Sequence, residues 1–229
     1  MKTFVNRKKG NDILIVVFSS WVVDEQAFLP YFDGSFDFMV LSGYSSDDPF
    51  IIPFSKTYRR IIVIAWSSGV WATEYFLAKT GINPDSLIAV NGTPFLVNDF
   101  YGIPVAKCED FINDLNFTKI ADMYNKIFGN EEILGKSADK TCRKDIEILH
   151  KDLRWLYNRA MEKSSSCLIW NYAVISQNND LMPISGIRKC WERIGSTKKI
   201  FVDMPFYPFK KWNTLLDFVD FVEQTNTDK

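Results

Sequence analysis

Residues 60–71 read Arg60-Ile61-Ile62-Val63-Ile64-Ala65-Trp66-Ser67-Ser68-Gly69-Val70-Trp71, and this stretch decides the fold. The apolar run Arg60–Ala65 predicts a strand that is covered on both faces, and the pattern over Gly69–Thr80 predicts a helix. The five residues Ala65–Gly69 match the G-x-S-x-G turn between a strand and a helix, with alanine in the first glycine position. The stretch therefore predicts a tight turn that presents Ser67 as a nucleophile, although either serine could instead simply cap the helix.

Strand-like and helix-like segments alternate on both sides of this turn. Apolar runs predict further strands at Ile13–Phe18, Phe36–Leu41, Ser86–Val90, Tyr172–Ser176 and Lys199–Asp203. Amphipathic spacing predicts further helices at Glu25–Phe32, Ile184–Ile194 and Asn213–Gln224. Such alternation indicates βαβ units and a parallel sheet.

One long block interrupts the alternation. Residues 108–165 show helical spacing and no convincing strand, which is typical of an inserted helical cap. The fold class predicted is α/β, of the α/β-hydrolase type, with a mostly parallel sheet and helices on both faces. Residues 1–107 and 166–229 would form the core, and residues 108–165 the cap.

Composition excludes several classes of function. The chain of 229 residues has a formal net charge of -1. It therefore lacks the excess of basic residues that would indicate a nucleic-acid partner. Four scattered cysteines (Cys108, Cys142, Cys167 and Cys190) form no C-x-x-C pair, and with one histidine they predict no metal site. They are typical of reduced thiols in a cytoplasmic protein. No segment is apolar and long enough to predict a membrane span, and we interpret the short run Ile13–Phe18 as a strand rather than a signal peptide.

A serine nucleophile on such a turn needs donors for the oxyanion and an acid to orient its base. The backbone N–H of Ser68, the residue after the nucleophile, is the first expected donor. The backbone N–H of Trp21, in the loop after an early strand, is the expected second donor, unless Trp21 is an ordinary buried tryptophan. Asp180, which follows a late strand, is the candidate acid, although it could also be a turn aspartate beside a helix start.

Several strings together resemble a known family, the pimeloyl-[acyl-carrier protein] methyl ester esterases of biotin synthesis, in their compact branch. They run almost from end to end: Ala65-Trp66-Ser67-Ser68-Gly69-Val70-Trp71, Ala89-Val90-Asn91-Gly92-Thr93-Pro94, Gly102-Ile103-Pro104, Asp180 with Pro183, and Asp203-Met204-Pro205-Phe206-Tyr207-Pro208-Phe209. The resemblance implies ester cleavage by a Ser-His-Asp triad without a cofactor. It implies Ser67 as the nucleophile, Asp180 as the acid and Trp21 as an oxyanion donor.

The chain departs from the family pattern at two places. The family has histidine where this chain has Phe206, and the one histidine, His150, falls in the predicted cap helix Asp145–Tyr157. The family's Gly-Trp-Gly at the oxyanion loop is replaced by Ser20-Trp21-Val22. Because serine, and still more β-branched valine, adopts positive φ poorly, this loop is expected to be impaired as well.

These departures favour lost or strongly reduced activity. Removing the triad histidine of a serine protease costs a factor of roughly 10⁶ in turnover. Two alternatives stay open: an active ester hydrolase with a non-standard base, and a non-catalytic relative that binds an acyl chain or a protein. We expect Phe206→His alone to restore little if the oxyanion loop is also impaired.

The resemblance also implies an acyl ester substrate or an acyl-carrier protein as partner. Acyl-carrier proteins are acidic, so basic residues of the cap could steer one in. The candidates are Arg143, Lys144, Lys151, Arg154, Arg159 and Lys163. Interleaved acids such as Asp145, Glu147 and Asp152 fit an ordinary solvated face equally well. The oligomeric state is not predicted.

Overall fold

A computed structural model describes residues 1–48, 51–52, 57–128, 145–162, 166–179 and 181–225. Seven strands form one sheet in the order β1-β3-β2-β4-β5-β6-β7. They are β1 (Lys2–Asn6), β2 (Ile13–Phe18), β3 (Asp37–Ser42), β4 (Arg60–Trp66), β5 (Ser86–Val90), β6 (Tyr172–Ser176) and β7 (Lys198–Val202). Every pairing is parallel except that of β1 with β3. The order and direction confirm the predicted α/β-hydrolase type.

The central strands are buried on both faces, as their continuous apolar runs predict. In β2 and β4, residues such as Val16, Val63 and Ile64 have no exposed surface. Strand β1 was missed because its sequence, Lys2-Thr3-Phe4-Val5-Asn6, is polar and largely exposed. It lies at the edge of the sheet, where only one neighbour and one covered face are needed.

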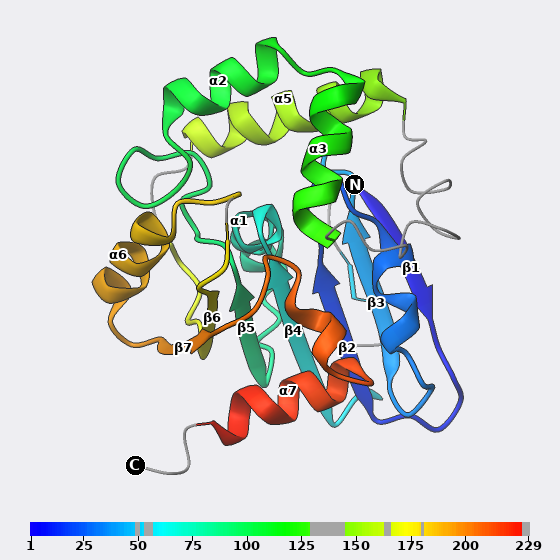
Figure 1. Cartoon of the computed structure of the whole chain (residues 1–229). Helices are drawn as coiled ribbons and strands as arrows, with labels where there is room; N and C mark the ends of the chain where they lie inside the picture. The colour runs from blue at the N-terminus through cyan, green and yellow to red at the C-terminus, as the bar shows by residue number, and fades with distance from the viewer. Residues whose placement is uncertain (49–50, 53–56, 129–144, 163–165, 180, 226–229) are drawn as a thin grey trace.

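Helices cover the sheet and one of its ends (Figure 1). The helices are α1 (Ser68–Phe76), α2 (Val105–Asn113), α3 (Phe117–Phe128), α5 (Ile146–Glu162), α6 (Ile184–Ile194) and α7 (Leu215–Gln224), with a short 3-10 turn, η5, at Pro208–Lys211. Helices α2, α3 and α5 lie together above the end of the sheet toward which β4 and β5 run (Figure 1). This is the place expected for a cap, although the boundaries 108 and 165 stay a prediction and residues 129–144 lie outside the described residues.

The prediction of an α-helix over Glu25–Phe32 is wrong in the type of helix. The chain forms two 3-10 turns there, Glu25–Ala27 and Leu29–Tyr31, and not an α-helix. Pro30 explains the difference, because proline lacks an N–H and disfavours the helical conformation in the residue before it.

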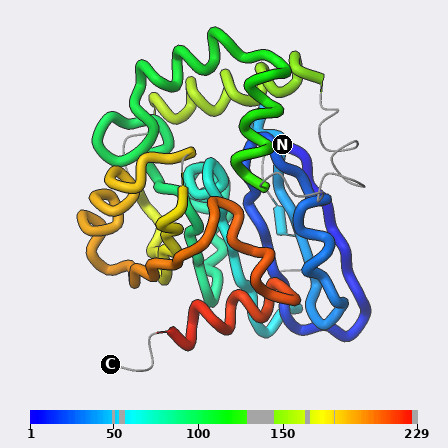
Figure 2. Tube along the Cα trace, viewed as in Figure 1, coloured from blue at the N-terminus to red at the C-terminus, as the bar shows by residue number. Residues whose placement is uncertain are grey.

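The last described helix, α7, lies toward the end of the sheet that is away from α2, α3 and α5 (Figure 2). An aromatic cluster joins the last part of the chain to the sheet: Phe209 lies 6.4 Å from Trp66 of β4 between ring centroids, and 5.2 Å from Phe218 of α7. The loop before α7 is thereby tied to the centre of the fold.

Three further features bear on the sequence analysis. No helix in the described part of the chain is long and apolar enough to cross a membrane. No group of three or more potential metal ligands is found among the described residues. Burial raises the pKa of Cys108 to about 11 and that of Cys190 to about 12, so both thiols stay protonated near neutral pH.

Candidate active site

Ser67 occupies a strained turn between β4 and α1. Its φ is 58° and its ψ is -123°, in the positive-φ region that L-residues rarely adopt. Its N–H donates to the carbonyl O of Val90 at 2.9 Å, which ties the turn to the end of β5. Backbone strain of this kind costs about 1–3 kcal/mol and persists only where the surroundings enforce it.

The small residues around Ser67 permit a close approach of backbones. A Cβ on Gly69 would lie 2.0 Å from the carbonyl O of Phe18, at the end of β2. A Cβ on Gly92 would lie 2.2 Å from the carbonyl O of Ser67 itself. Glycine at both positions is therefore a steric requirement of the turn. The G-x-S-x-G pattern indicates Gly69, whereas Gly92 lies outside it.

Neither serine of the turn caps the helix with its side chain. Ser67 makes no side-chain capping bond to α1. The Oγ of Ser68 accepts a hydrogen bond from the backbone N–H of Trp21, at 2.9 Å. The simple capping interpretation of Ser67 and Ser68 therefore does not fit the geometry.

The loop that carries Trp21 is held at several points. Tyr44 donates its hydroxyl to the carbonyl O of Ser19 at 2.8 Å, and Tyr124 of α3 donates to the carbonyl O of Val22 at 2.5 Å. The Val23 N–H closes a turn on the carbonyl O of Ser20 at 3.1 Å. Among the described non-glycine residues only Ser67 and Asn91 have positive φ, so Ser20 and Val22 take up this loop without the strain expected of them.

Phe206 is buried beside the nucleophile turn. Its side chain is 3% exposed, and its ring centroid lies 5.3 Å from that of Trp66, the residue before Ser67. Its carbonyl O accepts two hydrogen bonds, from Trp66 Nε1 at 3.0 Å and from Asn91 Nδ2 at 2.8 Å. The backbone at position 206 is thus fixed by groups that do not depend on the side chain there.

Asn91 connects three parts of the site. Besides Phe206, its Nδ2 donates to Ser176 Oγ at 2.8 Å, and its Oδ1 accepts from the Ser176 N–H at 2.7 Å. Asn91 has a φ of 49°, a conformation that asparagine tolerates better than most residues. The Val90-Asn91-Gly92-Thr93 string therefore has a physical role that sequence reasoning did not assign: it joins the ends of β5 and β6 to the loop of Phe206.

The other candidate groups are placed as follows. Asp180 lies outside the described residues, so its role stays a prediction. His150 is in α5, where its Nε2 lies 2.9 Å from the carbonyl O of Ile112 in α2. Lys210 donates to the carbonyl O of Phe128, the last residue of α3, at 2.6 Å. Among the described residues no side chain forms a hydrogen bond with Ser67 Oγ.

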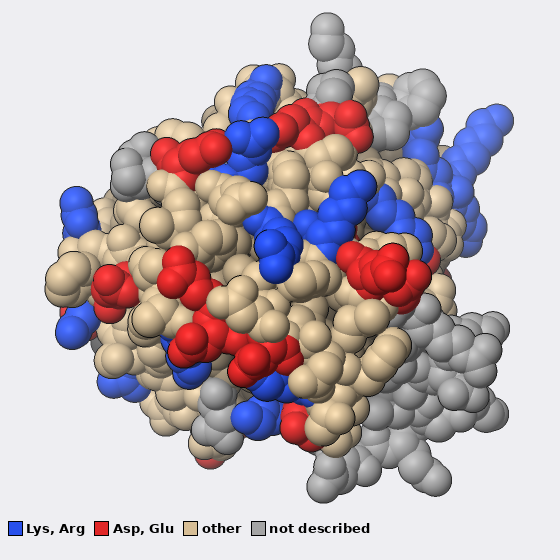
Figure 3. Space-filling model, turned by 90° about the horizontal axis from the view of Figure 1, so that it is seen from above, with Lys and Arg blue, Asp and Glu red and all other residues tan. Residues whose placement is uncertain are grey.

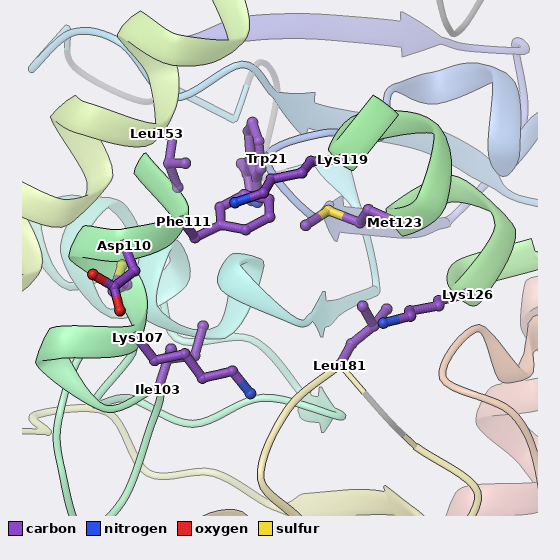
Figure 4. A pocket seen from close by; sticks show the side chains of 11 residues that line it. Trp21, Ile103, Lys107, Asp110, Phe111, Lys119, Met123, Lys126, Leu153 and Leu181 are labelled. Atoms are coloured by element: carbon purple, nitrogen blue, oxygen red, sulfur yellow. The ribbon is translucent and has the colours of Figure 1, made fainter. Parts of the chain in front are cut away.

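A pocket of about 340 Å³ opens between the cap helices and the oxyanion loop (Figure 4). Its apolar lining comes from Trp21, Ile103, Phe111, Met123, Leu153 and Leu181. Trp21 packs on Phe111 of α2, with 6.4 Å between ring centroids. Ser67 is not among the lining residues, so the pocket adjoins the oxyanion loop rather than enclosing the nucleophile.

Three lysines also line this pocket, a feature that sequence analysis missed. They are Lys107 of α2 and Lys119 and Lys126 of α3. Lys119 forms an ion pair with Asp114 at 3.2 Å. Viewed from above, the molecule presents Lys and Arg side chains near the centre of the cap face, with acidic side chains around them (Figure 3). Only the helix arrangement could reveal this grouping, since Lys107 and Lys126 are 19 positions apart in the sequence.

The basic cap residues singled out from the sequence are less prominent. Arg159 is paired with Asp47 at 2.7 Å and with Glu162 at 2.8 Å. Arg143, Lys144 and Lys163 lie outside the described residues. The charge of Arg159 is thereby largely compensated by its two neighbours.

Solved structures share this fold. The crystal structure of selenomethionine BioG from Haemophilus influenzae matches with a TM-score of 0.80 and 21% identity, over 95% of this chain and 99% of that one. The structure of MenH from S. aureus matches with a TM-score of 0.61 and 11% identity, over 98% of each chain.

Sequence comparison identifies the family. A malonyl-[acyl-carrier protein] O-methyltransferase of Bacteroides fragilis (strain 638R) is 28% identical over 179 residues. That match covers 78% of this chain but only 36% of the methyltransferase. The family model described as pimeloyl-ACP methyl esterase BioG matches residues 1–215. The chain therefore belongs to the BioG family of pimeloyl-ACP methyl esterases.

Proposed function

We propose that this protein binds methyl esters of pimeloyl chains carried on acyl-carrier protein at a Ser67-centred site, and that it hydrolyses them slowly or not at all. The observation that supports the proposal is the buried side chain of Phe206. It stands at the position where the resemblance to the family implies a histidine. The proposed acid, Asp180, would have no imidazole there to orient.

The chemistry follows from the groups beside Ser67. A serine hydroxyl attacks an ester carbonyl efficiently only when a base removes its proton. A phenylalanine ring at position 206 cannot accept that proton. His150 has its Nε2 on the carbonyl O of Ile112, and Lys210 has its Nζ on the carbonyl O of Phe128, so both alternative bases have other partners.

Substrate binding is proposed for the pocket under the cap. Its volume of about 340 Å³ and its mainly apolar lining suit an acyl chain. Lys107 and Lys126 at the same pocket would attract the acidic surface or the phosphate of a carrier protein. These two lysines are stronger candidates than Arg159, which already has two carboxylate partners.

Methanol release from pimeloyl-ACP methyl ester tests the catalytic half of the proposal. We expect turnover by the natural chain to lie near the background rate and Phe206→His to raise it by about 10²-fold, the low end for a general base. The modest gain is expected because position 206 is buried and packed against Trp66 by a phenylalanine ring, which leaves a new imidazole little freedom to orient. Ser67→Ala in the Phe206→His background is the control and should abolish the gain.

Three results would change the proposal about catalysis. Robust turnover by the natural chain that is lost in Ser67→Ala would establish a non-standard base. A gain in Phe206→His that approaches 10⁶-fold would show that the oxyanion loop is fully competent. No gain at all would favour a relative that only binds.

Carrier-protein affinity tests the binding half. Lys107→Glu with Lys126→Glu should weaken binding of pimeloyl-ACP methyl ester, and the loss should shrink at high salt. Arg159→Glu is the matched control on the cap and should change affinity less. Equal effects of the two changes would argue against docking at the pocket.

A further inference from the structure

The hydroxyl of Ser68 meets the backbone group that is expected to be the second oxyanion donor. The Trp21 N–H, the expected second donor, donates to Ser68 Oγ at 2.9 Å, and this bond is buried. An oxyanion donor has to point at the oxygen of the reacting group. In this protein the Trp21 N–H points at a side-chain oxygen of the protein itself.

The oxyanion loop cannot easily direct that N–H elsewhere. Tyr44 fixes the carbonyl of Ser19 before it, and Tyr124 fixes the carbonyl of Val22 after it. Both hydroxyls come from outside the loop, one from the region after β3 and one from α3. A rotation of the peptide between Ser20 and Trp21 would have to occur within these two anchors.

Ser68 is equally constrained. It begins α1, is 2% exposed, and precedes Gly69, whose Cα approaches the carbonyl of Phe18 too closely for any Cβ. The hydroxyl of Ser68 accepts from Trp21, and among the described residues its own hydrogen has no acceptor. A hydroxyl carries one donor besides its acceptor sites, so this donor is available to a ligand.

We propose that Ser68 Oγ–H, polarised by the Trp21 N–H, donates a hydrogen bond to the ester carbonyl oxygen beside the backbone N–H of Ser68. The proposal rests on the proposed function in one respect, namely that the Ser67 site receives a carboxyl ester. A hydroxyl that accepts one hydrogen bond becomes a better donor of the next, because a chain of hydrogen bonds polarises its members. No proton is transferred in this step: the hydroxyl stabilises the developing negative charge by a hydrogen bond alone.

Donation is favoured over displacement of the hydroxyl by the substrate. Displacement would break the bond from Trp21 and would require a new place for a hydroxyl in a turn that is almost fully enclosed. Donation keeps every existing bond and adds one. Ser68 would then be a catalytic residue through its side chain as well as through its N–H.

Binding of an alkylboronic acid tests this without requiring turnover. Ser67 Oγ adds to the boron atom of pentylboronic acid. A tetrahedral anion forms, and the serine proton is released to the buffer. An oxygen of that anion takes the place of the oxyanion. The dissociation constant is measured by the tetrahedral ¹¹B NMR signal, and Ser67→Ala shows how much of the signal depends on the nucleophile.

We expect Ser68→Ala to weaken the Ser67-dependent adduct at least about 10-fold, since one oxyanion donor is worth up to 10²–10³ in rate. Ser68→Thr and Ser68→Val form a pair of equal size, of which only the threonine variant should bind boronate within about threefold of the natural chain. Thermal unfolding of each variant separates a folding defect from a lost donor.

Two results would overturn the proposal. Unchanged or tighter boronate binding in Ser68→Ala would mean that the Trp21 N–H is the donor and that the hydroxyl masks it. Absence of a Ser67-dependent adduct in the natural chain would mean that no oxyanion is held there. If the adduct depends on Ser67 and Ser68 but pimeloyl-ACP methyl ester does not bind, only the proposed substrate is wrong.

Discussion

The turn that holds the candidate nucleophile, Trp66–Gly69, and the C-terminal loop, residues 203–209, pack against each other. Both have a fixed backbone, but only the turn presents a side chain that is proposed to react. The turn holds Ser67 at a φ of 58° with glycine where backbones touch. The loop holds the carbonyl of Phe206 with two hydrogen bonds from Trp66 and Asn91. The groups that fix the backbone at position 206 are thus separate from the side chain there, so a change of that side chain need not move the loop.

The largest expected effect comes from Gly69→Ala, which attacks the nucleophile turn directly. The new Cβ would lie 2.0 Å from the carbonyl O of Phe18, and a backbone atom in a central strand cannot move aside. We expect the free energy of unfolding to fall by about 3 kcal/mol or more, measured by urea denaturation.

Gly186→Ala is the control for that change. Gly186 lies within α6, and its new Cβ would have no neighbouring atom closer than 3.5 Å. Alanine favours a helix by up to about 1 kcal/mol over glycine, so this variant should be neutral or more stable. Similar losses in both variants would contradict the steric account of the turn.

Asn91→Ala tests the connection between the two regions. It removes both hydrogen bonds to Ser176 and one of the two to the carbonyl of Phe206. Because the Ser176 N–H and the Phe206 carbonyl are buried, the loss should be about 2–3 kcal/mol in the free energy of unfolding.

Asn178→Ala provides the matched comparison, since Asn178 donates to Asp203 at 2.6 Å in an exposed position. That change should cost less than about 0.5 kcal/mol. If chemical denaturation gave equal losses for the two asparagines, the connecting role of Asn91 would be refuted.

Asp37→Asn tests a charged network that lies outside both regions. It should lower the free energy of unfolding without changing ligand binding at Ser67. Burial alone would raise the pKa of Asp37. Hydrogen bonds from the Lys8 N–H, Tyr58, Asn11 and Arg7 outweigh burial and hold that pKa below its usual value of 3.8. The carboxylate thus stabilises the fold above pH 3.8, and this contribution is lost as pH falls through the lowered native pKa.

At pH 7, Asp37→Asn should therefore lower the free energy of unfolding by about 2 kcal/mol. The difference in free energy of unfolding between this variant and the natural chain should become smaller below pH 3.8. Urea denaturation at pH 7, 5 and 3 measures this difference. A difference that grew as the pH fell would contradict a lowered pKa of Asp37. The Ser67-dependent boronate affinity at pH 7 should stay unchanged.

Tyr124→Phe has the smallest expected effect and tests how the cap supports the oxyanion loop. It removes the buried hydrogen bond to the carbonyl of Val22 and should cost about 1 kcal/mol in unfolding free energy. Tyr157→Phe is the control, because its hydroxyl bonds Glu109 at an exposed position, where the bond raises the pKa of Tyr157 to about 12. A larger loss in thermal stability for Tyr157→Phe would show that the α3 contact does not support the loop.

The sequence alone determined the fold and the position of the candidate nucleophile, Ser67. Continuous apolar runs predicted six of the strands. Five of them, β2 to β6, are almost wholly buried, and a parallel strand covered on both faces needs apolar side chains along its length. The sixth, β7, is a partly exposed edge strand. The string Ala65–Gly69 predicted the strained serine because a tight turn between a strand and a helix admits only small residues around it. The sequence also predicts that Phe206 stands where the family has its histidine, and this stays a prediction.

Only the tertiary structure decided how these residues meet. The bond from Trp21 to Ser68 joins positions 47 residues apart, and that from Asn91 to Phe206 joins positions 115 apart. No local pattern encodes such contacts, because they depend on how strand ends converge once the sheet is formed. The sequence thus specified which groups are present, and the packing of the loops over the sheet decided that the expected oxyanion donor meets a hydroxyl of the protein itself.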